Sequence, residues 1–213
     1  MVCNCCEITD NAFTEAEARA DLKNYRRRGP AKQTRLLLEG LRALKQSNAT
    51  LLDIGGGIGA IHHELLEDVG VSAIHVDASS AYLKAAREET ERRGHSGQVE
   101  FIHADFTAVA TDVPAVDLVT LDRVVCCFPD FRSLLSLAAG HSRIALALTY
   151  PRETWYLRLG VAILNFLQRL RRDPFRGFVH PVAEMQAVLE NAGLSQVSLR
   201  RLFVWEVAVY RRA

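Results

Sequence analysis

A glycine-rich segment between an apolar run and a helical pattern constrains this chain more than any other feature. Residues 51–60 read Leu-Leu-Asp-Ile-Gly-Gly-Gly-Ile-Gly-Ala, which places Asp53, Gly55, Gly57 and Gly59 in the spacing Asp-x-Gly-x-Gly-x-Gly. Glycine is needed where a backbone turns with unusual dihedral angles or where a ligand lies directly against it. The helix that follows would direct its free N–H groups and positive dipole end towards that ligand. The segment therefore predicts a strand, a tight ligand-binding turn and a helix.

Two common phosphate-binding motifs do not match this segment. It lacks the Gly-Lys-Ser/Thr sequence of a P-loop, and Ala60 after Gly59 departs from the dinucleotide pattern Gly-x-Gly-x-x-Gly. Asp53 ends the predicted strand, where a carboxylate is poorly suited to a pyrophosphate. It is better suited to a ligand that carries a positive charge or hydroxyl groups.

Acidic residues also follow the next two predicted strands. Residues 72–77 end in Asp77, and residues 99–104 are followed by Asp105. Asp77 lies at the distance from the glycines at which a doubly wound fold places the carboxylate that holds ribose hydroxyls. We therefore expect Asp53, Asp77 and Asp105 along one edge of a parallel sheet.

These motifs, taken in order, resemble those of class I S-adenosylmethionine-dependent methyltransferases over roughly the central two-thirds of the chain. The resemblance implies an α/β fold with a Rossmann-like, doubly wound, mostly parallel seven-stranded sheet, N-terminal helices and a helical insertion after strand five. It also implies that the glycine loop cradles the methionine part of S-adenosylmethionine, that Asp77 holds the ribose hydroxyls and that Asp105 meets the adenine amino group. The expected cofactor-binding residues are Asp53, Gly55, Gly57, Gly59, Asp77, Ala78, Asp105, Phe106 and Asp122.

Length and composition predict one globular domain. About half of the 213 residues are hydrophobic (49%), which is enough for a full core, and a formal net charge of +1 gives no bulk field that would attract nucleic acid. We expect a single methyltransferase domain over residues 1–213, with a helical cover over 1–45 and a lid-like insertion over 150–180. The sequence leaves the oligomeric state open.

The cysteines predict reduced thiols in a cytoplasmic protein. Their number is odd, they lie in adjacent pairs, and no secretory pattern precedes them. The five are Cys3, Cys5, Cys6, Cys126 and Cys127. The first three lack the paired C-x-x-C spacing of a structural zinc site, so we favour a frayed terminus over soft-metal or metalloid binding.

The histidines also predict no metal site. Their positions show no ligand spacing, and the neighbours His62 and His63 cannot share one helix face. We expect structural roles for His62, His63, His75, His95 and His103.

The segment after the predicted strand 116–122 runs beside the transferable methyl group in this family. From Asp122 to Asp130 it lacks the Asn/Asp-Pro-Pro-Tyr/Phe sequence of amino methylation, which argues against a DNA methyltransferase. Cys126 and Cys127 lie in this segment. We expect them to line the cofactor or acceptor cleft as small buried side chains.

The insertion after strand five contains an apolar run, residues 155–167, that Arg158 interrupts. Three interpretations compete. We favour a lid over an apolar acceptor, followed by a packed core helix, whereas peripheral contact with a membrane surface is not favoured. The order of Tyr150-Pro151-Arg152, an apolar helix and residues 180–184 (His-Pro-Val-Ala-Glu) is loosely similar to magnesium-protoporphyrin O-methyltransferases. That similarity implies an apolar acceptor pocket, but not the porphyrin itself.

We therefore expect a methyltransferase that acts on a small, largely apolar or aromatic acceptor, with O-methylation favoured. His180 and Tyr150 are the candidate catalytic residues, because they flank the insertion that should cover the acceptor. The alternatives are a metalloid or thiol methyltransferase that uses the cysteines and a non-catalytic cofactor-binding module. A dehydrogenase that binds NAD is a poorer interpretation.

Overall fold

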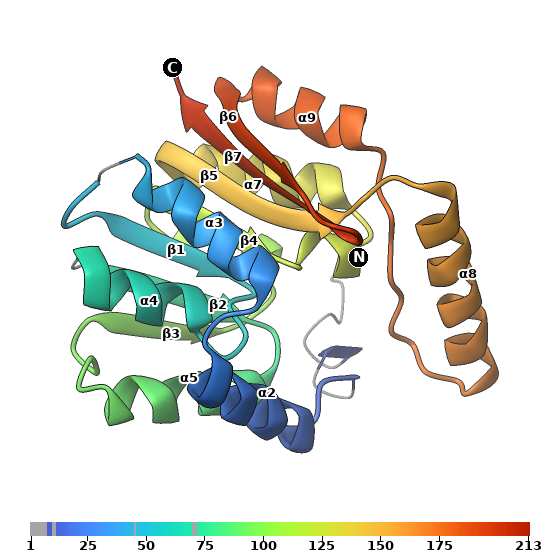
Figure 1. The fold of residues 1–213 in the computed structure, drawn as a ribbon, viewed down its shortest axis with the longest axis horizontal. Helices are drawn as coiled ribbons and strands as arrows, with labels where there is room; N and C mark the ends of the chain where they lie inside the picture. The colour runs from blue at the N-terminus through green and yellow to red at the C-terminus, as the bar shows by residue number, and fades with distance from the viewer. Residues whose placement is uncertain (1–7, 10–11, 45, 70–71) are drawn as a thin grey trace.

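A seven-stranded sheet organises the chain (Figure 1). The computed structural model describes residues 8–9, 12–44, 46–69 and 72–213. Its strands are β1 (Thr50–Ile54), β2 (Ser72–Asp77), β3 (Val99–His103), β4 (Val116–Asp122), β5 (Ser142–Pro151), β6 (Leu194–Arg201) and β7 (Trp205–Arg212). Their order is β3-β2-β1-β4-β5-β7-β6; β1 to β5 pair in parallel, and β7 is antiparallel to both of its neighbours. The predicted mostly parallel, doubly wound sheet is confirmed.

Helices cover both faces of this sheet. The helices are α2 (Glu15–Arg28), α3 (Lys32–Arg42), α4 (Ala60–Val69), α5 (Ser80–Arg92), α6 (Phe106–Val109), α7 (Phe131–His141), α8 (Trp155–Leu170) and α9 (Val182–Asn191), of which α8 does not cover the sheet. One buried apolar cluster joins the sheet to α6, α7 and α9, and another joins its opposite face to α3 and α4. Neighbouring side chains of a strand point to opposite faces. Leu52 and Ile54 of β1 accordingly pack in the first cluster, whereas Leu51 packs in the second.

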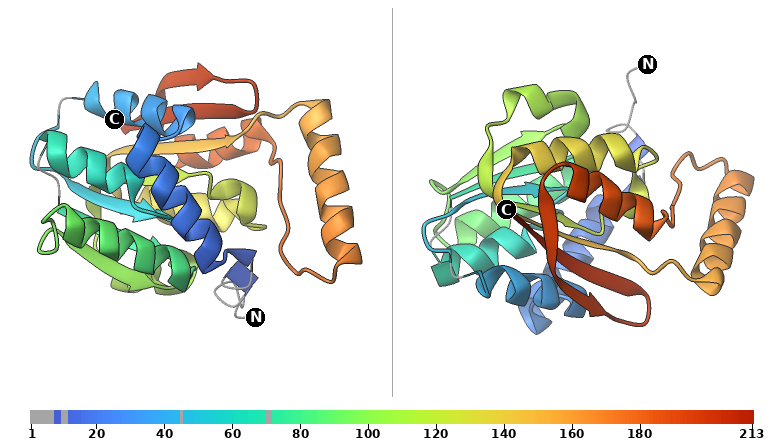
Figure 2. Two further views of the ribbon diagram at one scale, coloured as in Figure 1. Left: turned by 60° about the horizontal axis from the view of Figure 1, so that its bottom comes forward. Right: turned by 90° about the horizontal axis from the view of Figure 1, so that it is seen from above.

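α8 differs from the other long helices, because none of its residues is buried. It stands apart from the sheet in both views of Figure 2, and its apolar side chains face outwards. Trp155 is 77% exposed and Phe166 is 59% exposed. The interpretation as a packed core helix is therefore wrong. Among the described residues, we find no helix with the length and hydropathy needed to cross a membrane.

A buried carboxylate fastens α2 to α5. Glu89 of α5 is fully buried and accepts hydrogen bonds from Arg26 of α2 at 2.7 Å, from Arg92 at 2.6 Å and from Arg93 at 2.8 Å. Burial by itself would raise the pKa of Glu89, but the hydrogen bonds from the three arginines hold that pKa well below its usual range. α2 is thus held against α5 by charge as well as by apolar packing.

We expect Glu89→Gln to lower the free energy of unfolding by about 3 kcal/mol, because it removes the charge of a fully buried carboxylate that three arginines hold. For a chain of this size, that loss corresponds to a decrease in melting temperature of about 6–12 °C. Thermal unfolding followed by circular dichroism would measure it. Glu88→Gln is the matched control, since Glu88 is the exposed neighbour on the same helix. Equal melting temperatures for the two variants would contradict a stabilising role for this cluster.

Candidate functional site

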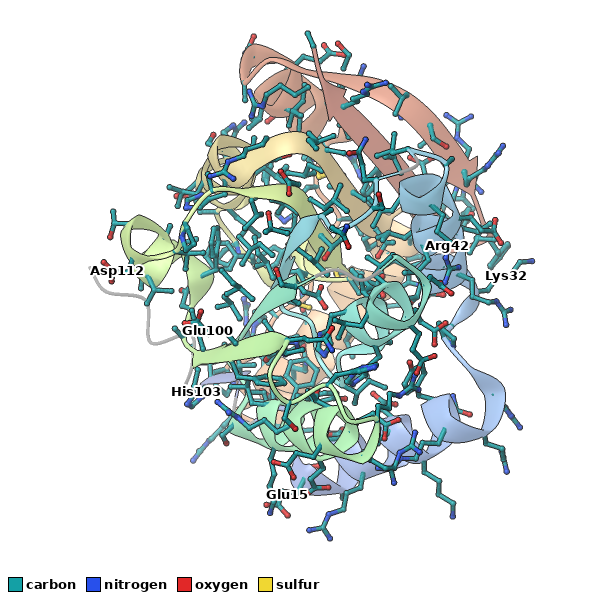
Figure 3. The ribbon with its side chains drawn as sticks, turned by 90° about the vertical axis from the view of Figure 1, so that its left-hand side faces the viewer. Glu15, Lys32, Arg42, Glu100, His103 and Asp112 are labelled. Carbon is teal, nitrogen blue, oxygen red and sulfur yellow. The ribbon has the colours of Figure 1, made fainter. Side chains whose placement is uncertain are left out.

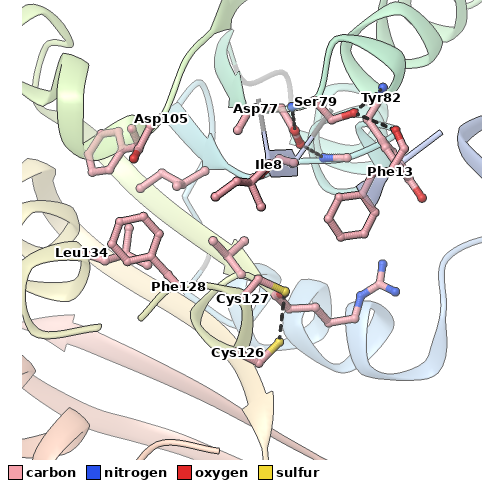
Figure 4. A pocket seen from close by; sticks show the side chains of 18 of the residues that line it. Ile8, Phe13, Asp77, Ser79, Tyr82, Asp105, Cys126, Cys127, Phe128 and Leu134 are labelled. Atoms are coloured by element: carbon pink, nitrogen blue, oxygen red, sulfur yellow. Dashed lines mark hydrogen bonds between the residues drawn. The ribbon is translucent and has the colours of Figure 1, made fainter. Parts of the chain in front are cut away.

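A cavity of about 630 Å³ opens at the carboxyl ends of the parallel strands (Figure 4). Gly55, Asp77, Asp105 and Asp122, which lie at or just beyond the ends of β1 to β4, all line it. The cavity lies where the strand order reverses between β1 and β4. Ligands bind at this switch point in open α/β sheets.

The glycine-rich loop forms one wall of the cavity. Gly55 and Gly57 have φ angles of 60° and 58°, in the left-handed region that favours glycine. A Cβ at Gly55 would lie 2.5 Å from a methyl carbon of Val124. The Gly57 N–H donates to Asp77 Oδ2 at 2.8 Å. The loop therefore depends on glycine for its backbone dihedral angles, and at Gly55 also for space.

Backbone donors fix the Asp77 carboxylate at the cavity wall. Its Oδ2 accepts from Gly57, and its Oδ1 accepts from the Ser79 N–H at 2.8 Å. Burial raises the pKa of this carboxyl to about 6, against the lowering effect of the two N–H donors. These hydrogen bonds hold the Asp77 side chain in one orientation. Its oxygens are therefore positioned to accept hydrogen bonds from the hydroxyl groups of a ligand.

Hydroxyl groups orient the other two carboxylates. Asp105 Oδ1 accepts from the N–H and from the Oγ of Thr107, both at 2.9 Å. Asp122 accepts from Thr34 Oγ at 2.6 Å and from Thr149 Oγ at 2.5 Å. Because Thr34 belongs to α3, the N-terminal part of the chain helps to position Asp122.

Apolar and aromatic side chains form the rest of the cavity. Most come from three segments that lie far apart in the sequence: the start of the described chain, the turn after β4, and residues 174–178, which we call the strap. Tyr82 of α5 and Leu134 of α7 also contribute. Phe13 contacts Phe175 of the strap edge to face, with ring centroids 5.3 Å apart, and contacts Tyr82 at 5.9 Å. The aromatic and aliphatic lining includes Ile8, Phe13, Tyr82, Val124, Phe128, Leu134, Phe175 and Phe178. The N-terminal segment and the strap therefore meet beside the cavity.

Comparison with known proteins agrees with this geometry. Residues 51–143, which carry the glycine loop and all three strand-end carboxylates, match the family model of the methyltransferase domain. The chain carries a class I S-adenosylmethionine-dependent methyltransferase domain. It is 29% identical over 147 residues to ribosomal protein L11 methyltransferase of Edwardsiella ictaluri (strain 93-146), a match that covers 60% of this chain and 50% of that relative. The matched region thus spans half the length of this relative.

Solved structures share the fold of the methyltransferase domain. Magnesium protoporphyrin IX methyltransferase from Synechocystis PCC 6803, with bound S-adenosylhomocysteine, gives a TM-score of 0.74 at 19% identity, over 98% of this chain and 100% of that one. An O-methyltransferase family protein from Burkholderia thailandensis gives 0.68 at 19% identity, over 95% of this chain and 61% of that one. At these identities the likeness shows the fold alone.

Two of the expected cofactor residues do not line the cavity of the methyltransferase domain: Asp53 and Gly59. Asp53 is fully buried, and its Oδ1 accepts from Thr120 Oγ at 2.8 Å. It lies two residues from Leu51, which packs towards α3 and α4, so its side chain points to that face. The expected direct contact of these two residues with the cofactor stays a prediction. The other expected cofactor residues, Gly55, Gly57, Asp77, Ala78, Asp105, Phe106 and Asp122, all line the cavity.

The two residues expected to be catalytic are also absent from the cavity wall. His180 Nε2 lies 3.0 Å from the carbonyl oxygens of both Val125 and Phe128, and its ring stacks on Phe178. It therefore donates to the turn after β4 and holds that turn in place. Tyr150 is 3% exposed within β5. Neither residue lines the cavity, and their expected catalytic roles stay predictions.

The two vicinal thiols line the cavity, as expected from the sequence. Their Sγ atoms are 3.7 Å apart, and Cys126 Sγ donates to the Arg123 carbonyl oxygen at 3.2 Å. The hydrogen bond with Cys127, together with burial, raises the pKa of Cys126, and the same hydrogen bond lowers the pKa of Cys127. The N-terminal cysteines, Cys3, Cys5 and Cys6, lie outside the described residues.

Proposed function

We propose that the chain transfers a methyl group from S-adenosylmethionine to a small, largely apolar or aromatic acceptor, with oxygen as the favoured acceptor atom. The observation that supports this proposal is one cavity that is lined both by the carboxylates at the strand ends and by aromatic side chains. Its volume of about 630 Å³ lies within the ordinary range for small-molecule sites. The cavity can therefore hold a nucleoside cofactor beside an apolar acceptor.

The residues that line the cavity fit the cofactor. Gly55 and Gly57 would hold its methionine part, because their bare backbone allows close approach. Asp77 would accept hydrogen bonds from the ribose hydroxyls, and Asp105 would meet the adenine amino group. Ala78, Phe106 and Asp122 would contribute the remaining contacts at the strand ends. When bound, S-adenosylmethionine supplies a methyl group that its sulfonium already makes electrophilic.

The work left to the protein is to orient the acceptor and to exclude water. Holding the acceptor oxygen about 3 Å behind the methyl carbon, in line with the carbon–sulfur bond, can account for much of the rate. The contact between Phe13 and Phe175 would keep water from the reacting atoms. We propose that α8 and the strap act together as a lid.

Two arginines that line the cavity favour an anionic methyl acceptor. Among the described residues, the guanidinium groups that line the cavity are those of Arg123 and Arg176. They would attract a carboxylate or a phenolate. A carboxylate arrives ionised and needs no general base, which agrees with the position of His180 outside the cavity. An aromatic or apolar carboxylic acid is therefore the favoured acceptor.

The formation of S-adenosylhomocysteine tests the proposal. The full chain would be incubated with S-adenosylmethionine and, separately, with aromatic carboxylic acids, phenols, amines and arsenite. We expect O-methylated product from carboxylates or phenols. Turnover on arsenite alone would favour a metalloid methyltransferase, and tight cofactor binding without any product would favour a non-catalytic module. Binding of NAD instead of S-adenosylmethionine would indicate a dehydrogenase.

We expect Arg123→Met to raise the KM of a carboxylate acceptor about tenfold, because one charge-assisted hydrogen bond is lost. The dissociation constant of S-adenosylhomocysteine should change less than this KM, because Arg123 reaches the cofactor residues only through its ion pair with Asp122, at 3.8 Å. Steady-state kinetics and calorimetry would measure the two quantities. Arg19→Met is the control, because Arg19 is an exposed residue of α2 that does not line the cavity. A KM equal to that of the unmodified chain would remove Arg123 from the acceptor site.

A further inference from the structure

A cluster of buried polar side chains lies beneath the glycine-rich loop, outside the cavity. Asp53 comes from β1, His62 and His63 from α4, and His75 from β2. All four side chains are fully buried. Their sequence positions predicted no metal site, because three separate elements bring them together. Burial lowers the pKa of both His62 and His75 to about 3.

Three of these side chains have the spacing of metal ligands. His62 Nδ1 lies 3.2 Å from His75 Nδ1, which is within hydrogen-bond distance, and 3.6 Å from Asp53 Oδ2. One ligand atom of each residue lies within 4.8 Å of the others. In a tetrahedral zinc site with bonds of about 2.0–2.1 Å, neighbouring ligand atoms are about 3.3–3.4 Å apart. The two measured separations lie on either side of that value.

One carboxylate oxygen of this cluster has no hydrogen-bond partner among the described residues. Asp53 Oδ2 is buried without a hydrogen-bond partner among the described residues, whereas Oδ1 accepts from Thr120. A separation of 3.6 Å from His62 is too long for a hydrogen bond. A buried carboxylate oxygen without a partner raises the free energy of the folded state. A cation bound at this cluster would remove that penalty.

Gly56 packs directly against the same atoms. A Cβ at this position would lie 2.6 Å from Asp53 Oδ2 and 2.6 Å from His75 Nδ1. Unlike Gly55 and Gly57, Gly56 does not have a positive φ angle. Glycine is therefore needed here for the space next to the cluster and not for the backbone conformation.

We propose that Asp53, His62 and His75 bind one Zn²⁺ ion, with a water molecule as the fourth ligand. Two imidazoles and a carboxylate suit this ion, which favours tetrahedral coordination by nitrogen and oxygen. The ion joins β1, α4 and β2 directly beneath the glycine loop and so holds that loop in shape. Because the site is fully buried, the chain takes up the metal as it folds. This site does not depend on the proposed methyl transfer.

Metal analysis of the full chain, without a polyhistidine tag, tests the site. After growth with zinc and gel filtration in metal-free buffer, mass spectrometry should find about one zinc per chain. His62→Gln and Asp53→Asn should each retain less than about a tenth of that amount. His103→Gln is the matched control and should keep its zinc, since His103 is exposed and labelled on the outer surface in Figure 3.

A second set of variants separates this site from the N-terminal thiols. Replacement of Cys3, Cys5 and Cys6 by serine should leave the zinc content unchanged. Loss of the metal in this triple variant would overturn the proposal and assign the metal to the cysteines. Cobalt taken up in place of zinc should give the strong visible absorption of tetrahedral coordination, and the weak absorption of an octahedral complex would contradict the geometry.

Refolding of the unmodified chain keeps the test independent of variants that fail to fold. The chain would be unfolded, freed of metal, and refolded with either zinc or a chelator. Zinc should raise the melting temperature by at least about 5 °C, as expected for an ion that binds only the folded state. A zinc-refolded chain that holds less than about a tenth of an equivalent and melts at the same temperature as the chelated one would rule the site out.

Discussion

Asp77→Asn is expected to weaken the binding of S-adenosylhomocysteine about a hundredfold, because the affected hydrogen bonds involve a buried, charged acceptor. The Asp77 oxygens accept from the Gly57 and Ser79 N–H groups at 2.8 Å each. An asparagine amide turns a donor towards one of these N–H groups, so the loop loses a contact and the ribose loses an anionic acceptor. Isothermal titration calorimetry with S-adenosylhomocysteine would measure the change directly.

The control for this prediction is Asp112→Asn. Asp112 is exposed, does not line the cavity and is labelled on the outer surface in Figure 3. The melting temperatures of both variants would show whether Asp77→Asn disturbs the loop more than it disturbs the ligand. Unchanged affinity in the Asp77 variant would mean that the cofactor does not contact this carboxylate.

The carboxylates and glycines that line the cavity were largely predictable, because local sequence determines their positions. Parallel strands bring their carboxyl ends to one edge, so Asp77 and Asp105 could be placed from the ends of two apolar runs. The glycine spacing identified the turn between β1 and α4, and Gly55 and Gly57 have the expected positive φ angles. These features depend on neighbours within a few residues of the chain.

The position of Asp53 was not predicted, although the alternation of side chains along β1 indicates it. Leu51 and Asp53 must face the same side of the strand, and Ile54 the other. Ile54 lines the cavity, whereas Asp53 does not. The same reasoning explains the histidine cluster, since α4 covers the face to which Asp53 and His75 point.

The aromatic lining of the cavity was harder to predict, because it forms by contacts between segments that lie far apart in the sequence. Phe13 and Phe175 meet across more than 150 positions of the chain, and no short motif contains either residue. His180 and Tyr150 flank the insertion in sequence, but flanking positions do not determine where side chains point. The fold turns His180 towards two carbonyl oxygens and buries Tyr150 within the sheet.

Replacement of α8 by a flexible linker is expected to lower kcat/KM about a hundredfold while leaving cofactor affinity nearly unchanged, because the acceptor loses its fixed position. α8 anchors the strap: Asn165 donates to the Gly177 carbonyl oxygen and accepts from the Gly177 N–H, both at 2.9 Å. The strap is also tied to the cavity wall, since the Phe178 N–H donates to the Cys126 carbonyl oxygen at 2.7 Å. Without α8, Phe175 and Arg176 would lose their fixed positions, and water would enter beside the acceptor.

The replacement can be made without cutting into the core. No residue of α8 is buried, and a linker of about ten glycine and serine residues spans the length of its 16 residues. The melting temperature should therefore stay within a few degrees of that of the unmodified chain. Steady-state kinetics with an acceptor that the unmodified chain methylates would give kcat/KM, and calorimetry would give the cofactor affinity.

A single substitution separates anchoring by α8 from its apolar surface. Asn165→Ala removes both hydrogen bonds to the strap and should lower kcat/KM about tenfold, in line with the loss of two ordinary hydrogen bonds. Arg169→Ala removes an exposed side chain from the same helix and should have no effect. If the linker variant turned over acceptor as fast as the unmodified chain, α8 could not be the lid. If instead only the Asn165 variant were unaffected, the lid would depend on the exposed apolar face of α8 and not on its hold on the strap.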